Sequence, residues 1–525
     1  MNGVRASAAR TAVLVAAAFA LAACSSHAAT PVATRTPTPS PSVAPTVSRP
    51  ADPFPSQAVR LPAVDKGLPF TPASGAAVRG RLVFAHYLPF FTVSIDNQPW
   101  RTDYYSRSFL AVDGENGKHA AYGGFLRDRP LPRSPRAATS WQLLDLEDEV
   151  RRASAAGIDG FSLDLLEVPG DGDLRVLSVQ SQLLTAAHAV DRSFRVMLMP
   201  DMAGGMQNKP MDAVAAYVAQ LGRQPAAFHL TDGRLVVSPF NAESHSGAWW
   251  KQFIDLMRTT YGTSVALVPL FQDETKWAKS FAPISYGMSN WGGRSPAVNP
   301  VDRSEGSPIF RAEQVRARGK LWMQTVSVQD ERPYQAMYSE ADNTQNLRNT
   351  WQIARDSGSE WVQVATWNDY AEGTAISPSM HHGRAYLDLV SYYATWFKTG
   401  VEPPVARDMV YLTHRTQPYS ARPTYPETSL MQITAGSPAS DLVEALTFLT
   451  APATVTVTVG GETTTCDLPA GVNACDAPLR AGRVSVHVTR GATNVASVTS
   501  PFVVTLRPRV QDLQYIAVSS GRSRA

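Results

Sequence analysis

Short apolar segments alternate with amphipathic segments between residues 80 and 400, and this alternation limits the possible folds more than any other feature. Each apolar segment suits a β-strand that is buried on both faces, and the amphipathic segments have helical spacing. About eight strands alternating with helices over roughly 300 residues are typical of a (β/α)₈ barrel. The expected strands are 82–87, 158–165, 194–199, 235–237, 265–270, 284–286, 321–326 and 361–367.

An open, doubly wound sheet is the alternative arrangement of alternating strands and helices. That fold usually carries a glycine-rich phosphate loop after its first strand. Here the strand at 82–87 is followed by a long loop of Gly, Arg, Asp and aromatic residues without such a motif, so we favour the α/β class with a TIM-type barrel. The expected helices are 143–154, 174–190, 211–221, 249–259, 313–318, 342–355 and 386–397.

Beyond residue 401 the pattern changes to strict alternation. Thr and Val alternate over 454–459, which is followed by Gly460 and Gly461, and similar alternation occurs over 484–488. Short alternating strands separated by turn residues predict a small C-terminal β-sandwich. We therefore expect a catalytic barrel at 78–400 and a sandwich domain at 401–518.

The first residues have the pattern of an export signal. Arg5 and Arg10 precede an apolar run at 12–23, which is too short to span a bilayer as a mature helix. The run ends in Leu-Ala-Ala followed by Cys24, which resembles the lipobox of a bacterial lipoprotein. An ordinary signal with an incidental cysteine is the alternative. We expect residues 1–23 to be a signal peptide and lipid on Cys24 to hold the exported chain at the outer face of the cell membrane.

A tether and a disulfide are expected from composition. Residues 24–58 are rich in Pro, Thr, Ser and Ala, a composition that cannot bury a core and favours disorder. Of the three cysteines, Cys466 and Cys475 remain once Cys24 is lipidated. Because an exported protein meets an oxidising compartment, we predict that they pair rather than remain free thiols. So short a loop would stabilise the fold by roughly 2–3 kcal/mol in the chain-entropy model.

Charge and motifs exclude several function classes. The chain has 48 basic and 45 acidic residues, so electrostatics give no reason to expect a nucleic-acid partner. A G-x-S-x-G motif and an H-E-x-x-H motif are both missing, which argues against an α/β-hydrolase esterase and a zincin protease. Neither the remaining pair of cysteines nor the histidines have the spacing of metal ligands. We expect a monomer with no metal and no cofactor.

The carboxyl ends of the predicted strands carry polar and aromatic residues. Barrel active sites form at these ends, and acidic side chains after apolar strands are costly unless they are paired or face water. Carboxylates mixed with Trp and Tyr suit a sugar, since aromatic faces stack on pyranose C–H surfaces. The predicted polysaccharide contacts are His86, Tyr87, Asp164, Asp201, Tyr286, Trp291, Trp367, Asn368 and Tyr370.

Asp369 and Glu372 are the predicted catalytic pair. Residues three apart beyond a strand can face the same cleft, and glycoside hydrolysis needs one protonated and one ionised carboxyl group. Asp164 and Glu167 form a rival pair. Structural alternatives also exist: Asp369 could cap the final helix, Asp201 could cap its loop, His86 could be a core histidine, and Tyr286 and Trp291 could be packing residues.

Residues 365–372, with the sequence A-T-W-N-D-Y-A-E, resemble the W-N-D-Y-G-E segment of glycoside hydrolase family 71. Members of that family are α-1,3-glucanases, also called mutanases. Segments 83–87, 156–161 and 199–202 are similar to further family segments, so the resemblance covers roughly residues 80–400 and part of the β-rich tail.

The resemblance implies an endo-acting, inverting α-1,3-glucan hydrolase, with Glu372 as proton donor and Asp369 as the base for water. Ala371 replaces the usual Gly, and Gly373 stands where the family often has Ser. Both residues flank the catalytic pair, so a different polysaccharide substrate is one alternative. A carbohydrate-binding surface protein that has lost catalysis is the other.

Overall fold

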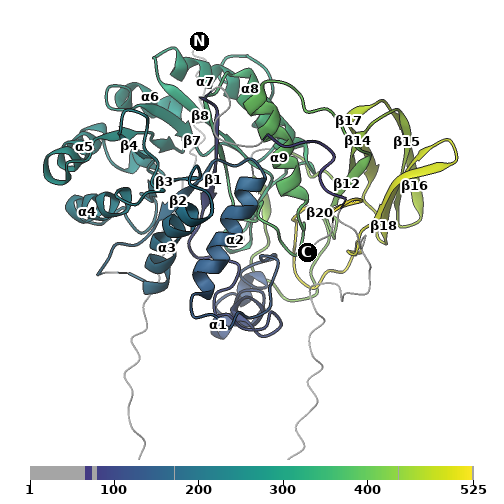
Figure 1. Ribbon diagram of the computed structural model, residues 1–525. Coiled ribbons are helices and arrows are strands. Elements are labelled where there is room, and N and C mark those ends of the chain that lie inside the picture. Colours follow the sequence, from purple (N-terminus) through teal and green to yellow (C-terminus); the bar gives the residue numbers. More distant parts are fainter. Residues whose placement is uncertain (1–65, 74–79, 171, 435–436, 523–525) are drawn as a thin grey trace, which may run out of the picture.

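Parallel strands buried on both faces form the centre of the computed structural model, which describes residues 66–73, 80–170, 172–434 and 437–522 (Figure 1). The predicted signal peptide, Cys24 and the tether lie outside the described residues. The strands are β1 (Leu82–Tyr87), β2 (Gly160–Leu165), β3 (Arg195–Pro200), β4 (Leu235–Val237), β5 (Val265–Leu267), β6 (Leu270–Phe271), β7 (Gly287–Asn290), β8 (Leu321–Val326) and β11 (Trp361–Val364).

The central sheet closes on itself. Its order is β5-β4-β3-β2-β1-β11-β8-β7-β6, so β5 and β6 are its two ends. Only Val268 and Pro269 separate them in the chain, and Pro269 has no N–H for strand pairing. The N–H of Val268 donates to the carbonyl of Val237, while the carbonyl of Leu267 accepts from Tyr286 on the other side. The nine strands therefore include one strand counted twice, which leaves an eight-stranded parallel barrel.

A helix follows each barrel strand and lies on the outside of the barrel (Figure 1). The apolar side chains of these helices pack against the strands. In α5, for example, Ser246 caps the first turn by accepting from the N–H of Trp249, and Gly262 ends the helix at φ 65°. Such a left-handed conformation favours glycine. The helices are α2 (Trp141–Ala155), α3 (Leu174–Val190), α4 (Met211–Gly222), α5 (Gly247–Tyr261), α6 (Glu274–Phe281), α7 (Pro308–Arg316), α8 (Gln345–Asp356) and α9 (Ala385–Thr399).

The predicted barrel is present, with two local differences. The prediction of a strand at 284–286 was wrong, because β7 begins only at Gly287. The sequence of β7, Gly-Met-Ser-Asn, has no apolar run. The polar Ser289 is nevertheless tolerated inside the barrel, because its hydroxyl donates to the carbonyl of Met323 at 2.7 Å. Helix α6 was not predicted from the sequence. Within the described residues, no helix is both long and apolar enough to cross a bilayer.

Two antiparallel sheets form the C-terminal part and share one apolar core, to which Val410 and Val443 contribute from one sheet and Val457 and Val486 from the other. This is the predicted β-sandwich architecture. A disulfide between Cys466 and Cys475 joins the two sheets. The strands are β12 (Met409–His414), β14 (Leu442–Leu449), β15 (Ala453–Val459), β16 (Glu462–Leu468), β17 (Gly471–Pro478), β18 (Val484–Arg490), β19 (Thr493–Thr499) and β20 (Ile516–Ser519).

A small third sheet links the barrel to the C-terminal chain. Strand β9 (Asp330–Arg332) follows β8 and pairs antiparallel with β10 (Met337–Ser339). Strand β10 pairs in parallel with β13 (Gln432–Thr434), which comes after the last barrel helix. The segment beyond β8 is therefore held by backbone pairing to a part of the chain about 100 residues further on.

Candidate active site

The alternation of side chains along the strands separates the barrel interior from the helix-facing surface. In β1, Phe84 and His86 point inward, whereas Val83, Ala85 and Tyr87 pack towards the helices. The lower interior is filled with an apolar cluster that includes Phe84, Met197, Val236, Ala266, Met323 and Trp361. Above this cluster, the carboxyl ends of the strands carry polar side chains, as expected for the functional end of a barrel.

Asp164 and His86 meet inside this polar layer. The Oδ2 atom of Asp164 lies 3.7 Å from Nε2 of His86, and its Oδ1 atom is buried without a hydrogen-bond partner among the described residues. Burial, followed by the charges of Asp201 and Asp369, raises the pKa of Asp164 well above its ordinary value. Burial, followed by the charge of Arg294, lowers the pKa of His86 to about 3, so this histidine is neutral at pH 7.

Asp201 lies at the same end, just after β3. Its Oδ1 atom accepts from the N–H groups of Ala203 (2.8 Å) and Gly204 (3.0 Å), so the side chain does cap its loop. Burial nevertheless raises the pKa of Asp201 to about 6. The charge of Asp201 also acts on Asp164. Asp201 therefore both caps its loop and belongs to the carboxylate cluster.

Asp369 is fixed by the backbone of its own loop after β11. Its Oδ1 atom accepts from the N–H groups of Ala371 (2.9 Å) and Glu372 (3.0 Å), and its own N–H donates to Oγ1 of Thr366 at 2.8 Å. Burial raises the pKa of Asp369 to about 6 against the opposing effect of these bonds and of Arg332. Asp369 and Glu372 both act electrostatically on Arg294 and Tyr334, so the turn places the two carboxyl groups near the same neighbours.

Glu372 is partly reached by solvent, with 15% of its side chain exposed. Its Oε1 atom lies 2.8 Å from Nη1 of Arg332, while Oε2 has no hydrogen-bond partner in the described structure. Burial raises the pKa of Glu372 to about 8; Arg332 opposes this shift, and Asp369 and Asp330 add to it. Burial thus raises the pKa of both carboxyl groups, and that of Glu372 more than that of Asp369, which is the order that a proton donor and a base would need.

Arg332 organises this side of the site. Its Nε and Nη2 groups donate to the two carboxylate oxygens of Asp330, each at 2.7 Å, while Nη1 reaches Glu372. Sequence reasoning missed both Arg332 and Asp330. The signal was available, because the D-E-R triplet at 330–332 follows the predicted strand 321–326 and the strand-end rule applies to it equally.

Trp291 lies at the barrel mouth, immediately after β7. Its ring centroid is 5.2 Å from that of His86 and 4.9 Å from that of Phe240, and the guanidinium carbon of Arg294 lies 4.9 Å from its centre. The ring is only partly buried. This places an aromatic surface beside the carboxylate cluster, at the position predicted for a sugar contact.

Four other predicted sugar contacts are packing or positioning residues instead. Tyr87 and Trp367 face α2, where both donate to the carboxyl group of the buried Glu149, at 2.7 and 3.2 Å. The side-chain amide of Asn368 accepts from the N–H of Leu88 and donates to the carbonyls of Leu88 and Phe91. The hydroxyl of Tyr370 bonds to Ser377 at 2.6 Å. All four predicted residues are at most 1% exposed, so they hold the loop that carries Asp369 and Glu372 and do not face a ligand.

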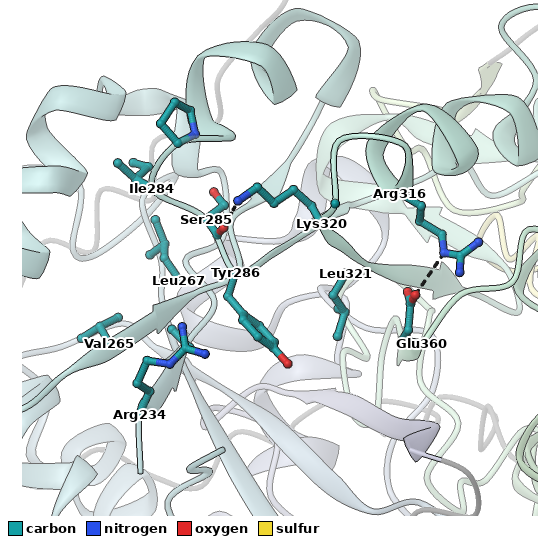
Figure 2. Close-up of a pocket in the computed structure, with 13 residues that line it drawn as sticks. Arg234, Val265, Leu267, Ile284, Ser285, Tyr286, Arg316, Lys320, Leu321 and Glu360 are labelled. Atoms are coloured by element: carbon teal, nitrogen blue, oxygen red, sulfur yellow. Dashed lines mark hydrogen bonds and ion pairs between the residues drawn. The ribbon is translucent and has the colours of Figure 1, made fainter. Parts of the chain in front are cut away.

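Tyr286 was also predicted wrongly, because it precedes β7 and therefore lies at the opposite end of the barrel. It lines a pocket of about 640 Å³ together with Ile284, Lys320 and Leu321, and the guanidinium of Arg234 lies 5.0 Å from its ring centre (Figure 2). The amino ends of TIM-barrel strands are usually associated with stability. This pocket is thus separate from the carboxylate cluster.

An eight-stranded barrel whose strand ends gather buried carboxylates beside a tryptophan defines a barrel glycoside hydrolase. More particularly, the chain belongs to glycosyl hydrolase family 71, whose sequence model matches residues 136–512. Within the described residues, no group of three His, Cys, Asp or Glu side chains is arranged to hold a metal ion.

Relatives and solved structures are similar at low identity. A glucan endo-1,3-alpha-glucosidase of Schizosaccharomyces pombe is 24% identical over 70% of this chain and 88% of its own length. A mutanase of Penicillium rubens is 24% identical over 68% of this chain and 80% of its own length. Among solved structures, a family 99 endo-alpha-mannosidase from Bacteroides thetaiotaomicron is 14% identical with a TM-score of 0.45, over 60% of this chain and 97% of that one.

The raised carboxyl pKa values predict a pH-dependent stability. Burial raises the pKa of Glu372 to about 8 and that of Glu149 to about 7, so the folded state binds these protons more tightly than the unfolded state. Their contribution is fully present at low pH and is lost as the pH rises through these values. Between pH 8.5 and 6.5 the free energy of unfolding should increase by about 3 kcal/mol.

Thermal denaturation across this pH range checks the sign. Below pH 6.5, Asp201 and Asp369, whose pKa values are raised to about 6, should add to the gain, whereas His86 and His414, whose pKa values are lowered to about 3 and about 4, should oppose it. Glu149→Gln removes one titrating group and should reduce the difference between pH 8.5 and 6.5. A melting temperature that falls over this interval on acidification would contradict the assignment.

Proposed function

We propose that this protein hydrolyses internal α-1,3 linkages of glucan with inversion at the anomeric carbon. The observation that carries the proposal is the Asp369–Glu372 loop, which holds two buried carboxyl groups at the barrel mouth, both with raised pKa values and the higher one at Glu372. Support for the substrate comes from the two relatives, which are named as an endo-1,3-alpha-glucosidase and a mutanase.

Each carboxyl group has one role in the proposed reaction. Glu372 donates its proton to the glycosidic oxygen as the bond to the anomeric carbon breaks, so the leaving chain departs as an alcohol. Asp369 accepts a proton from the water that attacks the opposite face of the same carbon. Trp291 provides a stacking surface, and Asp164 and Asp201 contact sugar hydroxyls. Exchange with solvent then returns Glu372 to its protonated form and Asp369 to its ionised form.

Digestion of a glycan panel tests the substrate. Insoluble α-1,3-glucan should release a ladder of oligosaccharides, whereas α-1,4-glucan, β-1,3-glucan and α-mannan should remain intact, as judged by mass spectrometry. Proton NMR at early times should show the anomer of opposite configuration to the cleaved bond. Hydrolysis restricted to another glycan would refute the substrate, and co-sedimentation with glucan without any product would favour a binding protein.

We also propose that the chain is exported to the outer face of a bacterial cell membrane and held there as a monomer through lipid on Cys24. The apolar run at 12–23 directly before this cysteine supports the anchor, and the Pro- and Thr-rich segment at 24–58 would separate the barrel from the membrane. Fatty-acid labelling should be found in the wild-type chain and be lost in Cys24→Ser. Equal labelling of both would exclude this cysteine as the lipid site.

A further inference from the structure

The loop after β7 holds a buried guanidinium at the barrel mouth whose hydrogen-bonding capacity is only half used. Nη1 of Arg294 donates to the carbonyls of Trp291 (2.6 Å) and Gly293 (3.3 Å), while Nε and Nη2 have no partner within the described part of the chain. The residue is 4% exposed. Buried charged donors are costly when unpaired, so this arrangement suggests that a ligand completes it.

An acceptor without a partner lies near the same guanidinium group. Asn290, the last residue of β7, donates through Nδ2 to Glu274 at 2.9 Å, which leaves its buried Oδ1 without a partner in the described chain. A Cβ atom at Gly292 would lie 3.7 Å from both this Oδ1 and Nη1 of Arg294, so the two side chains flank one position. The adjacent Trp291 ring supplies an apolar surface there.

The surrounding charges select the type of ligand. Arg294 shares its surroundings with Asp330, Asp369 and Glu372, and among the charged groups Asp330 acts on it most strongly, followed by Arg332 with the opposite sign. Carboxylates at the mouth would repel a phosphate or an acidic sugar. A hydroxyl group is uncharged and both donates and accepts, so it can satisfy the Arg294 donors and the Asn290 acceptor together.

We propose that Arg294, together with Asn290, binds hydroxyl groups of an uncharged sugar residue next to the scissile bond and thereby selects neutral glycans. This inference rests on the proposed function, because it assumes that the Asp369–Glu372 loop marks the cleavage point. Losing the charged hydrogen bonds should weaken binding roughly 10- to 100-fold. Arg294→Lys retains a charge but lacks the planar fork and should recover only part of the affinity.

A purely structural arginine would behave differently from a ligand-binding one. Arg129 is the matched control: it is 1% exposed, and its guanidinium is paired with both oxygens of Asp103 at 2.9 and 2.6 Å. Arg129→Met should lower the melting temperature strongly, because it leaves Asp103 buried and unpaired. Arg294→Met should lower the ligand-free melting temperature much less, since it removes two groups without a partner and only the bonds of Nη1 to the carbonyls of Trp291 and Gly293.

The decisive experiment measures the Kd of α-1,3-linked gluco-oligosaccharides by calorimetry, with every chain also carrying Glu372→Gln to prevent cleavage. Arg294→Met should raise Kd about 10- to 100-fold while lowering the melting temperature much less than Arg129→Met does. An unchanged Kd, or a loss of melting temperature equal to that of Arg129→Met, would overturn the inference. If the panel identifies another glycan, the proposed substrate is wrong and the same Kd comparison on that glycan decides on Arg294. If no glycan binds, both proposals are overturned.

Discussion

Glu372→Gln should lower kcat on α-1,3-glucan by roughly 10²- to 10⁴-fold, the usual contribution of a positioned proton donor. Asp369→Asn should cause a loss of similar size, because an amide cannot accept a proton from the attacking water. Neither substitution should lower the melting temperature, since each replaces a buried titrating group by a neutral one of the same shape. Release of reducing sugar and thermal denaturation provide the two measurements.

Glu147→Gln is the matched control for this pair. Glu147 lies on the outer surface of α2, where it pairs with Arg151 at 2.7 Å, and its substitution should leave kcat unchanged. Full activity in Glu372→Gln and Asp369→Asn would remove both residues from the mechanism. Asp164 and Asp201, which are buried at the same end of the barrel, would then be the candidates to test.

Arg332→Met should lower kcat by about 100-fold with a smaller change in KM, because the loss of its contacts frees the Glu372 side chain from its position. Arg332 lowers the pKa of Glu372, so its removal raises that pKa further. Since the protonated form of Glu372 is the active one, the alkaline limb of the pH–rate profile should move to higher pH. Arg332→Lys should move the alkaline limb part of the way back to its wild-type position.

Arg303→Met is the control for the loss of an arginine. Arg303 is exposed and pairs with Glu313 at 3.0 Å, far along the chain from the catalytic loop, so neither kcat nor the profile should change. A purely structural contribution of Arg332 would reduce the amount of folded enzyme but leave the alkaline limb where it is in the wild type. That outcome would separate Arg332 from the ionisation of Glu372.

The barrel and its carboxylates could be anticipated because both depend on local patterns. Buried strands and amphipathic helices alternate visibly, and the strand-end rule selects Asp164, Asp201, Asp369 and Glu372 without any tertiary information. The same rule failed for Tyr87, because a strand-end residue can equally face the helices. It failed for Tyr286 because β7 is polar, so the apolar window falls before the strand rather than on it.

Arg294 and Arg332 were missed for a different reason. Both lie in long segments beyond the strands, where sequence periodicity gives no direction for a side chain. Their roles depend on contacts between segments distant in sequence, such as the 2.8 Å approach of Arg332 to Glu372. Likewise, the hydrogen bond from the indole N–H of Trp367 to Glu149 depends on the packing of α2, a helix more than 200 residues earlier in the chain.

The pairing of β9 with β10, and of β10 with β13, bears on any attempt to shorten this enzyme. Arg332 belongs to β9, the N–H of its neighbour Glu331 donates to the carbonyl of Glu372 at 2.8 Å, and β13 is contributed by chain beyond α9. Gln514 also abuts the catalytic loop, where a Cβ atom at Gly373 would approach its Nε2 to 2.7 Å. A truncated version ending after α9 would keep every barrel strand but lose these supports, so the C-terminal region is an integral part of the catalytic unit and cannot be exchanged as a detachable module.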